Sequence, residues 1–244
     1  MKQERYLILD EIRGFTLLNM FFYHGIWDLV YLFGFDWGWY RSGGVRLWQQ
    51  AICWTFILLS GFCMPLGKHK LKRGLQILFL STLISAVTLL FTPESQVLFG
   101  ILSLLSSCML LMIPLEKLLE KCPAPAGFLL CMLLFFLTRP AGRGYLGLGE
   151  YQLFDLPASW YNGFFSAYLG FPPETFFSTD YFPIFPWIFL FLSGFFLHKI
   201  LASRNLMPRL KTGNQKSLIW LGQHSLLLYA IHQPVLYLIL SLVF

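Results

Sequence analysis

The sequence predicts an all-α integral membrane protein: a polytopic transmembrane helical bundle of about seven spans, with the N-terminus inside and the C-terminus outside. Hydrophobic residues make up 57% of the 244 residues and charged residues only 12%, whereas a soluble domain carries about 25% charged residues. The mean hydropathy is +0.63. The apolar runs are continuous, which is typical of transmembrane helices and not of the alternating strands of a membrane barrel.

Seven apolar segments follow one another, and we interpret residues 1–244 as one domain. The first run begins after a basic N-terminus, but no small-residue cleavage site follows it and charges interrupt it. We therefore expect a retained first span and not a signal peptide. The predicted spans lie near residues 12–33, 47–66, 73–92, 97–115, 124–138, 182–201 and 218–244.

The positive charges give the predicted orientation. With the N-terminus inside, the inner segments hold 14 of the 18 Lys and Arg residues and the outer segments hold 4. This bias is the usual positive-inside signal. It also explains the net charge of +6 as a topology signal, so we expect no nucleic-acid partner.

The five cysteines form no metal-binding or disulfide pattern. Their number is odd, no CxxC pair is present, and most lie in or beside predicted spans. We interpret them as small apolar core residues and predict no metal site.

One connection, residues 139–181 on the predicted outer side, is much longer than the others. It is rich in Gly, Pro and aromatic residues, and long connections in compact proteins are usually functional or disordered. Its aromatic residues argue against disorder. We expect a short interfacial or re-entrant helix that caps the bundle; an aromatic belt at the headgroup level is a compatible alternative.

The first predicted span carries a polar stripe. Arg13 and His24 are eleven residues apart, which brings them to within about 20° of one helical face. Asp10 lies about 40° from His24, and Asp28 follows His24 by one turn. Ionisable groups in a membrane helix usually face a bundle interior or a wet cavity and mark functional paths. A purely structural polar cluster is the alternative.

His24 and Asp28 form the sharpest candidate for catalysis. Side chains four residues apart on a helix can touch, and a carboxylate behind an imidazole fixes its tautomer and stabilises its charged form. His24 lies about 16 Å along the helix from Arg13. A base there can meet a donor arriving from one side and an acceptor from the other. Alternatively, His24 only hydrogen-bonds a neighbouring helix.

Basic residues at the predicted inner face are candidates for binding an anionic donor. Arg13 can pair with Asp10 or hold an anionic ligand. Lys72 and Arg73 belong to a basic cluster before the third span, and this cluster either sets the topology or attracts the phosphates of a donor such as a coenzyme A thioester.

His232 and Gln233 lie in apolar surroundings within the last span, with Tyr229 one turn earlier. Pro234 follows and frees a helix carbonyl. Such polar groups at a kink either line a cavity or pack helices together. We include His232 among the catalytic candidates and assign Gln233 and Tyr229 to substrate binding.

Two more candidates for substrate binding, Asp180 and Trp187, flank the start of the sixth span. Asp180 either binds an acceptor hydroxyl or caps this helix, and capping is the simpler interpretation.

Several short motifs are spread over nearly the whole chain. Near the N-terminus the pattern R-x4-D-x2-R-G is followed by a His at position 24. Further pieces are LLSG (58–61), FGIL (99–102), LGFPPETFFSTDYFPIFPW (169–187) and LGQHSLLLYAIHQPVLY (221–237). In this order, the motifs resemble the catalytic domain of the heparan-α-glucosaminide N-acetyltransferase family, a branch of the transmembrane acyltransferases, and in particular its bacterial relatives.

The resemblance implies acetyl transfer from acetyl-CoA, bound from the cytoplasm, to a sugar or similar acceptor on the far side. It implies that His24 is the catalytic histidine and that Arg13 binds the donor. The chain departs from the family pattern at Ser103, where we expect a His. Residues 36–48 also lack the catalytic His that animal members carry in this loop.

We therefore expect a membrane acyltransferase of the cell envelope, embedded in a bacterial cytoplasmic membrane, with acyl-CoA, a sugar or glycan acceptor and the lipid bilayer as partners. His24 or His232 is the base in a direct transfer, and Gln233 or Tyr229 stabilises the oxyanion. A covalent acyl-histidine route is the alternative that the sequence leaves open. The alternatives are a transporter or flippase of a sugar or lipid-linked substrate and a noncatalytic partner in an envelope-modification complex. The sequence leaves open whether the chain forms a homo-oligomer.

Overall fold

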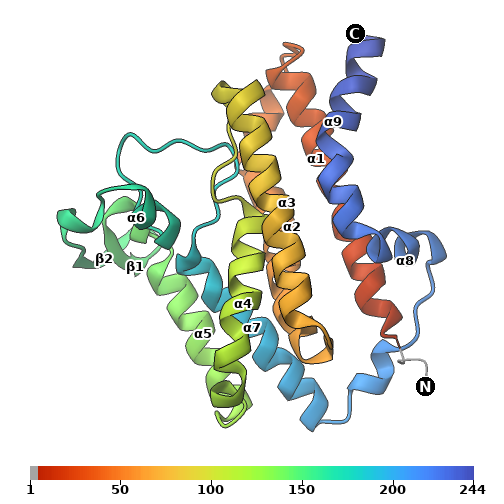
Figure 1. The fold of residues 1–244 in the computed structure, drawn as a ribbon, viewed down its shortest axis with the longest axis vertical. Helices are drawn as coiled ribbons and strands as arrows, with labels where there is room; N and C mark the ends of the chain where they lie inside the picture. The colour runs from red at the N-terminus through yellow and green to blue at the C-terminus, as the bar shows by residue number, and fades with distance from the viewer. Residues whose placement is uncertain (1–4) are drawn as a thin grey trace. The chain divides into compact units, whose positions relative to one another are not determined.

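The computed structural model describes residues 5–244 and confirms the all-α class, with nine α-helices in this part of the chain (Figure 1). The helices group into two compact units. The first unit contains the described residues up to Leu59 together with Leu201–Phe244, and the second contains Ser60–Ile200. The helices α2 (Gly43–Cys63) and α7 (Ile184–Ser203) cross the boundaries between them. Whether the chain is one domain stays a prediction.

Six of the described helices are long and apolar enough to cross a membrane, so the protein is an integral membrane protein. The first predicted span is also a single helix, α1 (Leu7–Tyr31), but its polar stripe lowers its hydropathy and it is not among the six. That α1 crosses the bilayer, and that the N-terminus lies inside, stay predictions. The six candidate spans are Gly43–Leu66, Lys70–Phe91, Ile101–Leu119, Ala124–Arg143, Ile184–Ser203 and Ser225–Val243.

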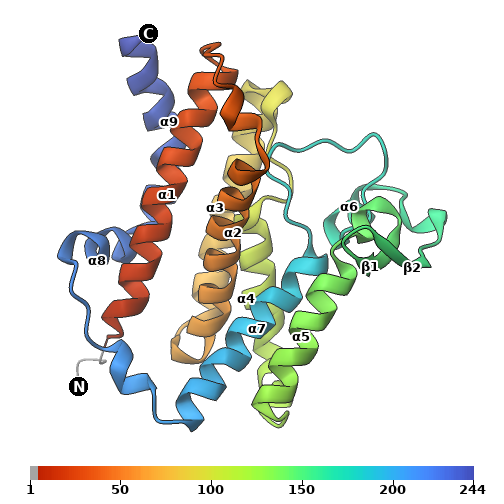
Figure 2. The same cartoon turned by 180° about the vertical axis from the view of Figure 1, so that it is seen from behind.

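The first unit contains α1, α8 (Lys216–Gln223) and α9 (Ser225–Val243). The prediction of one continuous span over 218–244 is wrong at its start, because the chain leaves the helical conformation at His224 (φ −103°, ψ 14°). Residues 216–223 therefore form a separate helix, α8, that packs against α1, while α9 runs beside α1 in the same direction (Figures 1 and 2).

Two glycines allow α1 and α8 to touch through their backbones. A Cβ atom on Gly14 would overlap the carbonyl oxygen of Leu218, and a Cβ on Gly222 would overlap that of Asp10. A side chain at either position would force the helices apart. The R-G and L-G-Q-H motifs therefore each supply one half of the same crossing.

Apolar side chains pack against α1 in two clusters. One cluster joins Leu17 and Met20 of α1 to Ile52 of α2. A second cluster, nearer the C-terminal end of α1, joins Val30 to Tyr40 and Val45. Tyr40 lies in a short 3-10 helix (Gly38–Arg41), and its hydroxyl donates to the carbonyl oxygen of Tyr23 at 3.1 Å.

The second unit is built on α3 (Lys70–Phe91), α4 (Ile101–Leu119), α5 (Ala124–Thr138) and most of α7. Lys70 of α3 forms an ion pair with Glu116 of α4. Lys199 of α7 donates to three carbonyl oxygens at the end of α4, those of Leu119, Glu120 and Cys122. Both lysines, counted above as topology signals, therefore also hold helices together.

The long connection contains the expected short helix, α6 (Phe164–Leu169), and a hairpin that was not predicted. Strands β1 (Tyr145–Leu148) and β2 (Tyr151–Asp155) pair antiparallel. Gly149 begins the two-residue turn with a positive φ of 63°, as hairpin turns require. The depth of α6 in a membrane stays a prediction. The remaining short 3-10 helices are Met64–Leu66, Pro93–Ser95, Ala141–Arg143, Ala158–Trp160 and Met207–Leu210.

We expect Gly14→Ala to lower the free energy of unfolding by about 1–3 kcal/mol, because the added methyl group meets backbone that cannot rotate away. The measurement is reversible unfolding in detergent, followed by circular dichroism.

Gly25→Ala is the matched control on the same helix. Its Cβ would lie 3.7 Å from the Leu236 side chain, an ordinary contact, so it should be neutral or stabilise the protein by up to about 1 kcal/mol through helix propensity. Equal effects of the two substitutions would contradict the proposed backbone contact.

Candidate functional site

The first unit brings together polar residues of α1 and α9. The ring centroids of His24 and His232 lie 4.9 Å apart, with an interplanar angle of 64°. Asp28, one turn beyond His24, and Gln233, next to His232, are joined by a hydrogen bond. The spacing of these residues on their helices was predicted from the sequence, but their meeting depends on the packing of α9 against α1.

Asp28 is fully buried, with 0% of its surface exposed. Its Oδ1 atom accepts a hydrogen bond of 2.6 Å from Nε2 of Gln233. The structure has no hydrogen bond between Asp28 and His24 among the described residues, so the expected contact within α1 is replaced by one between helices. A buried carboxylate needs a donor, and α9 supplies an amide that points straight at it. Orientation of His24 by Asp28 stays a prediction.

His232 has a ring fixed by its neighbours. Its Nδ1 lies 2.5 Å from the carbonyl oxygen of Tyr229, and the ring stacks on Phe21 of α1 at a centroid distance of 5.8 Å and an angle of 10°. The Tyr229 ring lies 5.2 Å away. These contacts leave the imidazole little freedom to turn.

Three buried polar atoms of this group have no hydrogen-bond partner in the described part of the chain: Asp28 Oδ2, Gln233 Oε1 and His232 Nε2. Buried polar atoms are normally satisfied, so each unpartnered atom needs an explanation. Two of the three are oxygens that can only accept hydrogen bonds. The group is therefore suited to bind hydroxyl or amine hydrogens. We refer to His24, Asp28, His232 and Gln233 as the histidine site.

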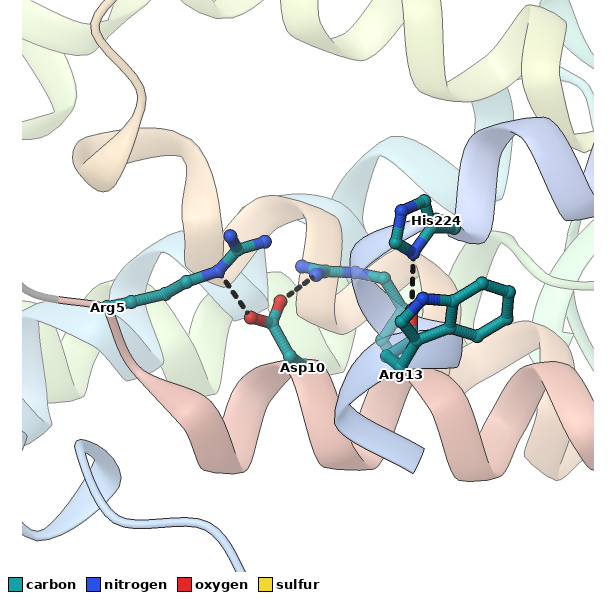
Figure 3. Close-up of polar contacts among 5 residues, drawn as sticks. Arg5, Asp10, Arg13 and His224 are labelled. Carbon is teal, nitrogen blue, oxygen red and sulfur yellow. Dashed lines mark hydrogen bonds and ion pairs between the residues drawn. The ribbon is translucent and has the colours of Figure 1, made fainter. Parts of the chain in front are cut away.

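A second polar group lies near the start of α1. Asp10, 6% exposed, accepts a 2.7 Å bond from Nε of Arg5 and a 2.8 Å bond from Nη1 of Arg13. Figure 3 shows the two guanidinium groups on either side of the carboxylate. Of the alternatives for Arg13, the structure contains the pairing with Asp10. The two arginines and one aspartate leave a net positive charge.

The basic candidates Lys72 and Arg73 lie in the first turn of α3, in the second unit, and both are exposed. Among the described residues, no hydrogen bond or ion pair joins them to Arg5, Asp10 or Arg13. Their role in donor binding stays a prediction.

Asp180 caps a helix, but not the one expected. Its Oδ2 accepts a hydrogen bond of 3.1 Å from the backbone N–H of Ile101, the first residue of α4. A Cβ on Gly100 would meet the same carboxylate, so the FGIL motif leaves room for Asp180. The expectation that Asp180 caps the sixth span is therefore wrong, because the chain folds back onto α4 here.

Trp187 is 9% exposed and packs against Phe182 and Phe135, with ring centroids 4.9 and 5.5 Å away. These contacts make it a core residue of the second unit. Substrate contacts for Asp180 and Trp187 stay predictions.

Sequence reasoning did not assign Arg5 and Phe21 to the candidate site. Arg5 belongs to the R-x4-D motif, whose spacing places it within reach of Asp10. Phe21 precedes His24 by three residues, so a shared helical face was a usable signal. Its stacking on His232 needs the position of α9, which the sequence does not give.

Comparison with known protein families identifies this architecture. The family model described as heparan-α-glucosaminide N-acetyltransferase, catalytic, matches residues 5–234. The chain therefore belongs to this family, as its motifs predicted, and is a membrane protein of acetyltransferase type. Neither the curated proteins nor the solved structures contain a match to this chain.

We expect a double-mutant cycle to find coupling between Asp28 and Gln233. Gln233→Leu and Asp28→Leu each leave one buried polar group unpaired, whereas the double variant leaves neither. The coupling free energy should be about 1.5–3 kcal/mol, the range for a hydrogen bond to a charged group. It is measured from the unfolding of all four proteins in detergent. Additive effects would contradict the recorded bond.

The capping of α4 predicts a pH dependence of stability. Burial raises the pKa of Asp180 from 3.8 to about 6, against the lowering effect of the Ile101 N–H. The folded state therefore holds its proton more tightly than the unfolded state, and Asp180 stabilises the fold at low pH. This contribution is lost as pH rises from about 4 to 6.

The test compares melting temperatures of the wild type and Asp180→Asn between pH 4 and 8. Asparagine keeps the oxygen that accepts from Ile101 but cannot titrate, so the variant should lack this part of the pH dependence. Identical profiles for both proteins would contradict a raised pKa.

Proposed function

We propose that the protein transfers an acetyl group from acetyl-CoA to an amine or hydroxyl of a sugar or glycan at the extracytoplasmic side of the membrane. Membership of an N-acetyltransferase family supports acetyl transfer in general. The name of the family makes an α-glucosaminide the first acceptor to test. The excess of basic residues in the predicted inner segments supports donor entry from the cytoplasmic side.

The observation that carries the proposal is the histidine site. Two imidazoles lie 4.9 Å apart beside a fully buried carboxylate, and three polar atoms of the group are buried without a partner. Polar groups are costly inside a membrane protein and are kept where they bind or react. An imidazole is the usual side chain for proton transfer near neutral pH.

The proposed reaction is direct transfer. A histidine of the site takes the proton from the acceptor amine or hydroxyl. The acceptor nitrogen or oxygen then bonds to the acetyl carbonyl carbon, the carbon–sulfur bond breaks, and coenzyme A leaves as a thiolate that regains the proton. Asp28 Oδ2 and Gln233 Oε1 can accept the remaining hydrogens of the acceptor and hold it in place.

Gln233 and Tyr229 both stay candidates for stabilising the oxyanion. Nε2 of Gln233 donates one hydrogen to Asp28 and, as part of a primary amide, carries a second hydrogen that can donate. The backbone carbonyl of Tyr229 faces His232, and its phenol hydroxyl is a donor by type.

We propose that Arg13 contributes to binding the phosphates of acetyl-CoA. Asp10 holds its guanidinium in a fixed position, while Arg5 offsets the charge of the carboxylate. A fixed guanidinium is well suited to phosphate oxygens. Lys72 and Arg73 are proposed to add positive charge that attracts the donor.

We expect acetyl-CoA to bind the purified protein in detergent and Arg13→Ala to weaken this binding about tenfold or more, since a hydrogen bond to a charged group contributes about 1.5–3 kcal/mol. Isothermal titration calorimetry measures the affinity. Arg41→Ala is the matched control, because Arg41 is exposed and far along the chain from this cluster.

The same preparations are then given radiolabelled acetyl-CoA and methyl α-D-glucosaminide. The wild type should form the acetylated sugar. A folded protein that neither binds acetyl-CoA nor releases labelled product would contradict the proposal and favour a transporter or a noncatalytic partner.

A further inference from the structure

We propose that His232, and not His24, is the base of the histidine site, and that His24 is a positioning residue that acts through the His232 ring. This inference rests on the proposed function. It deepens that function, because it assigns the proton transfer to one atom, Nε2 of His232, on the last helix of the chain.

The backbone fixes the tautomer of His232. Nδ1 lies 2.5 Å from the carbonyl oxygen of Tyr229. A carbonyl oxygen can only accept a hydrogen bond, so Nδ1 must carry the proton. In the neutral imidazole the lone pair then lies on Nε2. This is the role for which many enzymes use a carboxylate, and here a helix carbonyl performs it.

The location of Nε2 suits a base. It is buried and has no hydrogen-bond partner among the described residues. The stacking of the ring on Phe21 of α1, nearly parallel at 10°, holds the ring plane while the Tyr229 carbonyl holds its rotation. The lone pair therefore has one direction, and an acceptor group that reaches it meets a base that needs no reorganisation.

The neighbouring residue supplies the second half of the acceptor site. Gln233 follows His232 directly and donates Nε2–H to Asp28 Oδ1. This bond leaves the other oxygen of each residue, Gln233 Oε1 and Asp28 Oδ2, without a partner among the described residues. The acceptor can give the hydrogen that is transferred to His232 Nε2. Its other hydrogens can bond to these two oxygens, which hold the acceptor in its orientation.

His24 has a different environment. The structure records ring contacts for it, edge-on to His232 at 4.9 Å and to Tyr23 at 5.6 Å, but no hydrogen bond that fixes its tautomer within the described residues. Asp28, expected behind it, is bonded to Gln233 instead. His24 thus confines the His232 ring by packing edge-on against it. An aromatic ring without nitrogen can serve the same purpose.

The proton balance closes on His232. Nε2 takes the proton of the acceptor amine or hydroxyl as the new bond to the acetyl carbon forms. The carbon–sulfur bond breaks, and the proton on Nε2 passes to the departing coenzyme A thiolate. His232 is neutral again at the end, with its Nδ1–H bond to Tyr229 intact throughout.

The kinetic test uses His232→Ala and His24→Phe, with radiolabelled acetyl-CoA and methyl α-D-glucosaminide. We expect His232→Ala to lower kcat by about 10²–10⁴-fold, the usual contribution of a general base, with the KM for acetyl-CoA unchanged and partial rescue by added imidazole. His24→Phe should keep kcat within about tenfold of the wild type, with no rescue by imidazole. His69→Ala, an exposed histidine, is the control. The reverse ranking of the two variants would overturn the inference.

A second measurement does not depend on turnover. Nitrogen-15 spectra of histidine-labelled protein, with the His232 signals assigned through His232→Gln, report which ring nitrogen carries the proton. Protonated Nδ1 and unprotonated Nε2 are expected, and a proton on Nε2 would overturn the inference. Absence of acetyl transfer by the wild type, together with the expected spectrum, would contradict the proposed function and leave the tautomer assignment supported.

Discussion

The backbone contact between α1 and α8 is the constraint on which the first unit depends. Gly14 and Gly222 each remove a Cβ that would overlap the other helix, so the backbones of the two helices are in contact. Only His224 separates α8 from α9. Fixing α8 on α1 therefore sets where α9 begins, and this in turn decides which residues of α9 face His24 and Asp28.

This packing places two polar groups along α1. Near its start, Asp10 is held between two arginines, and its own carbonyl is the atom that Gly222 approaches. Further along, Asp28 meets Gln233 and His24 meets His232. The carboxylates of Asp10 and Asp28 are both buried, so a hydrogen bond to either has a larger effect than in water.

The sequence was sufficient for what depends on one helix at a time. The apolar runs predicted the long helices, and the spacing of Asp10, Arg13, His24 and Asp28 predicted the polar stripe. It was insufficient where two segments compete for one group. Asp28 lies one turn from His24, but it accepts its hydrogen bond from the amide of Gln233 and not from His24. Similarly, Asp180 lies beside α7 in the sequence but caps α4, because the long connection returns to that helix.

Two motifs of the family resemblance have roles in packing that their sequences alone do not reveal. Gly61 of LLSG lets α2 approach the backbone of α7 at Phe191, and Gly100 of FGIL makes room for the Asp180 carboxylate. These positions are explained by close approach, which only a folded chain displays. The residues with reactive side chains were recognisable by type, and their partners were not.

The central claim is that the histidine site between α1 and α9 carries out acetyl transfer. The most direct test is the rate of labelled acetyl transfer to methyl α-D-glucosaminide by the double variant His24→Ala/His232→Ala in lipid nanodiscs, with acetyl-CoA binding measured on the same sample. The claim predicts that the double variant folds and binds acetyl-CoA but transfers acetyl groups only at the background rate. A double variant that transfers acetyl groups at the wild-type rate would contradict it.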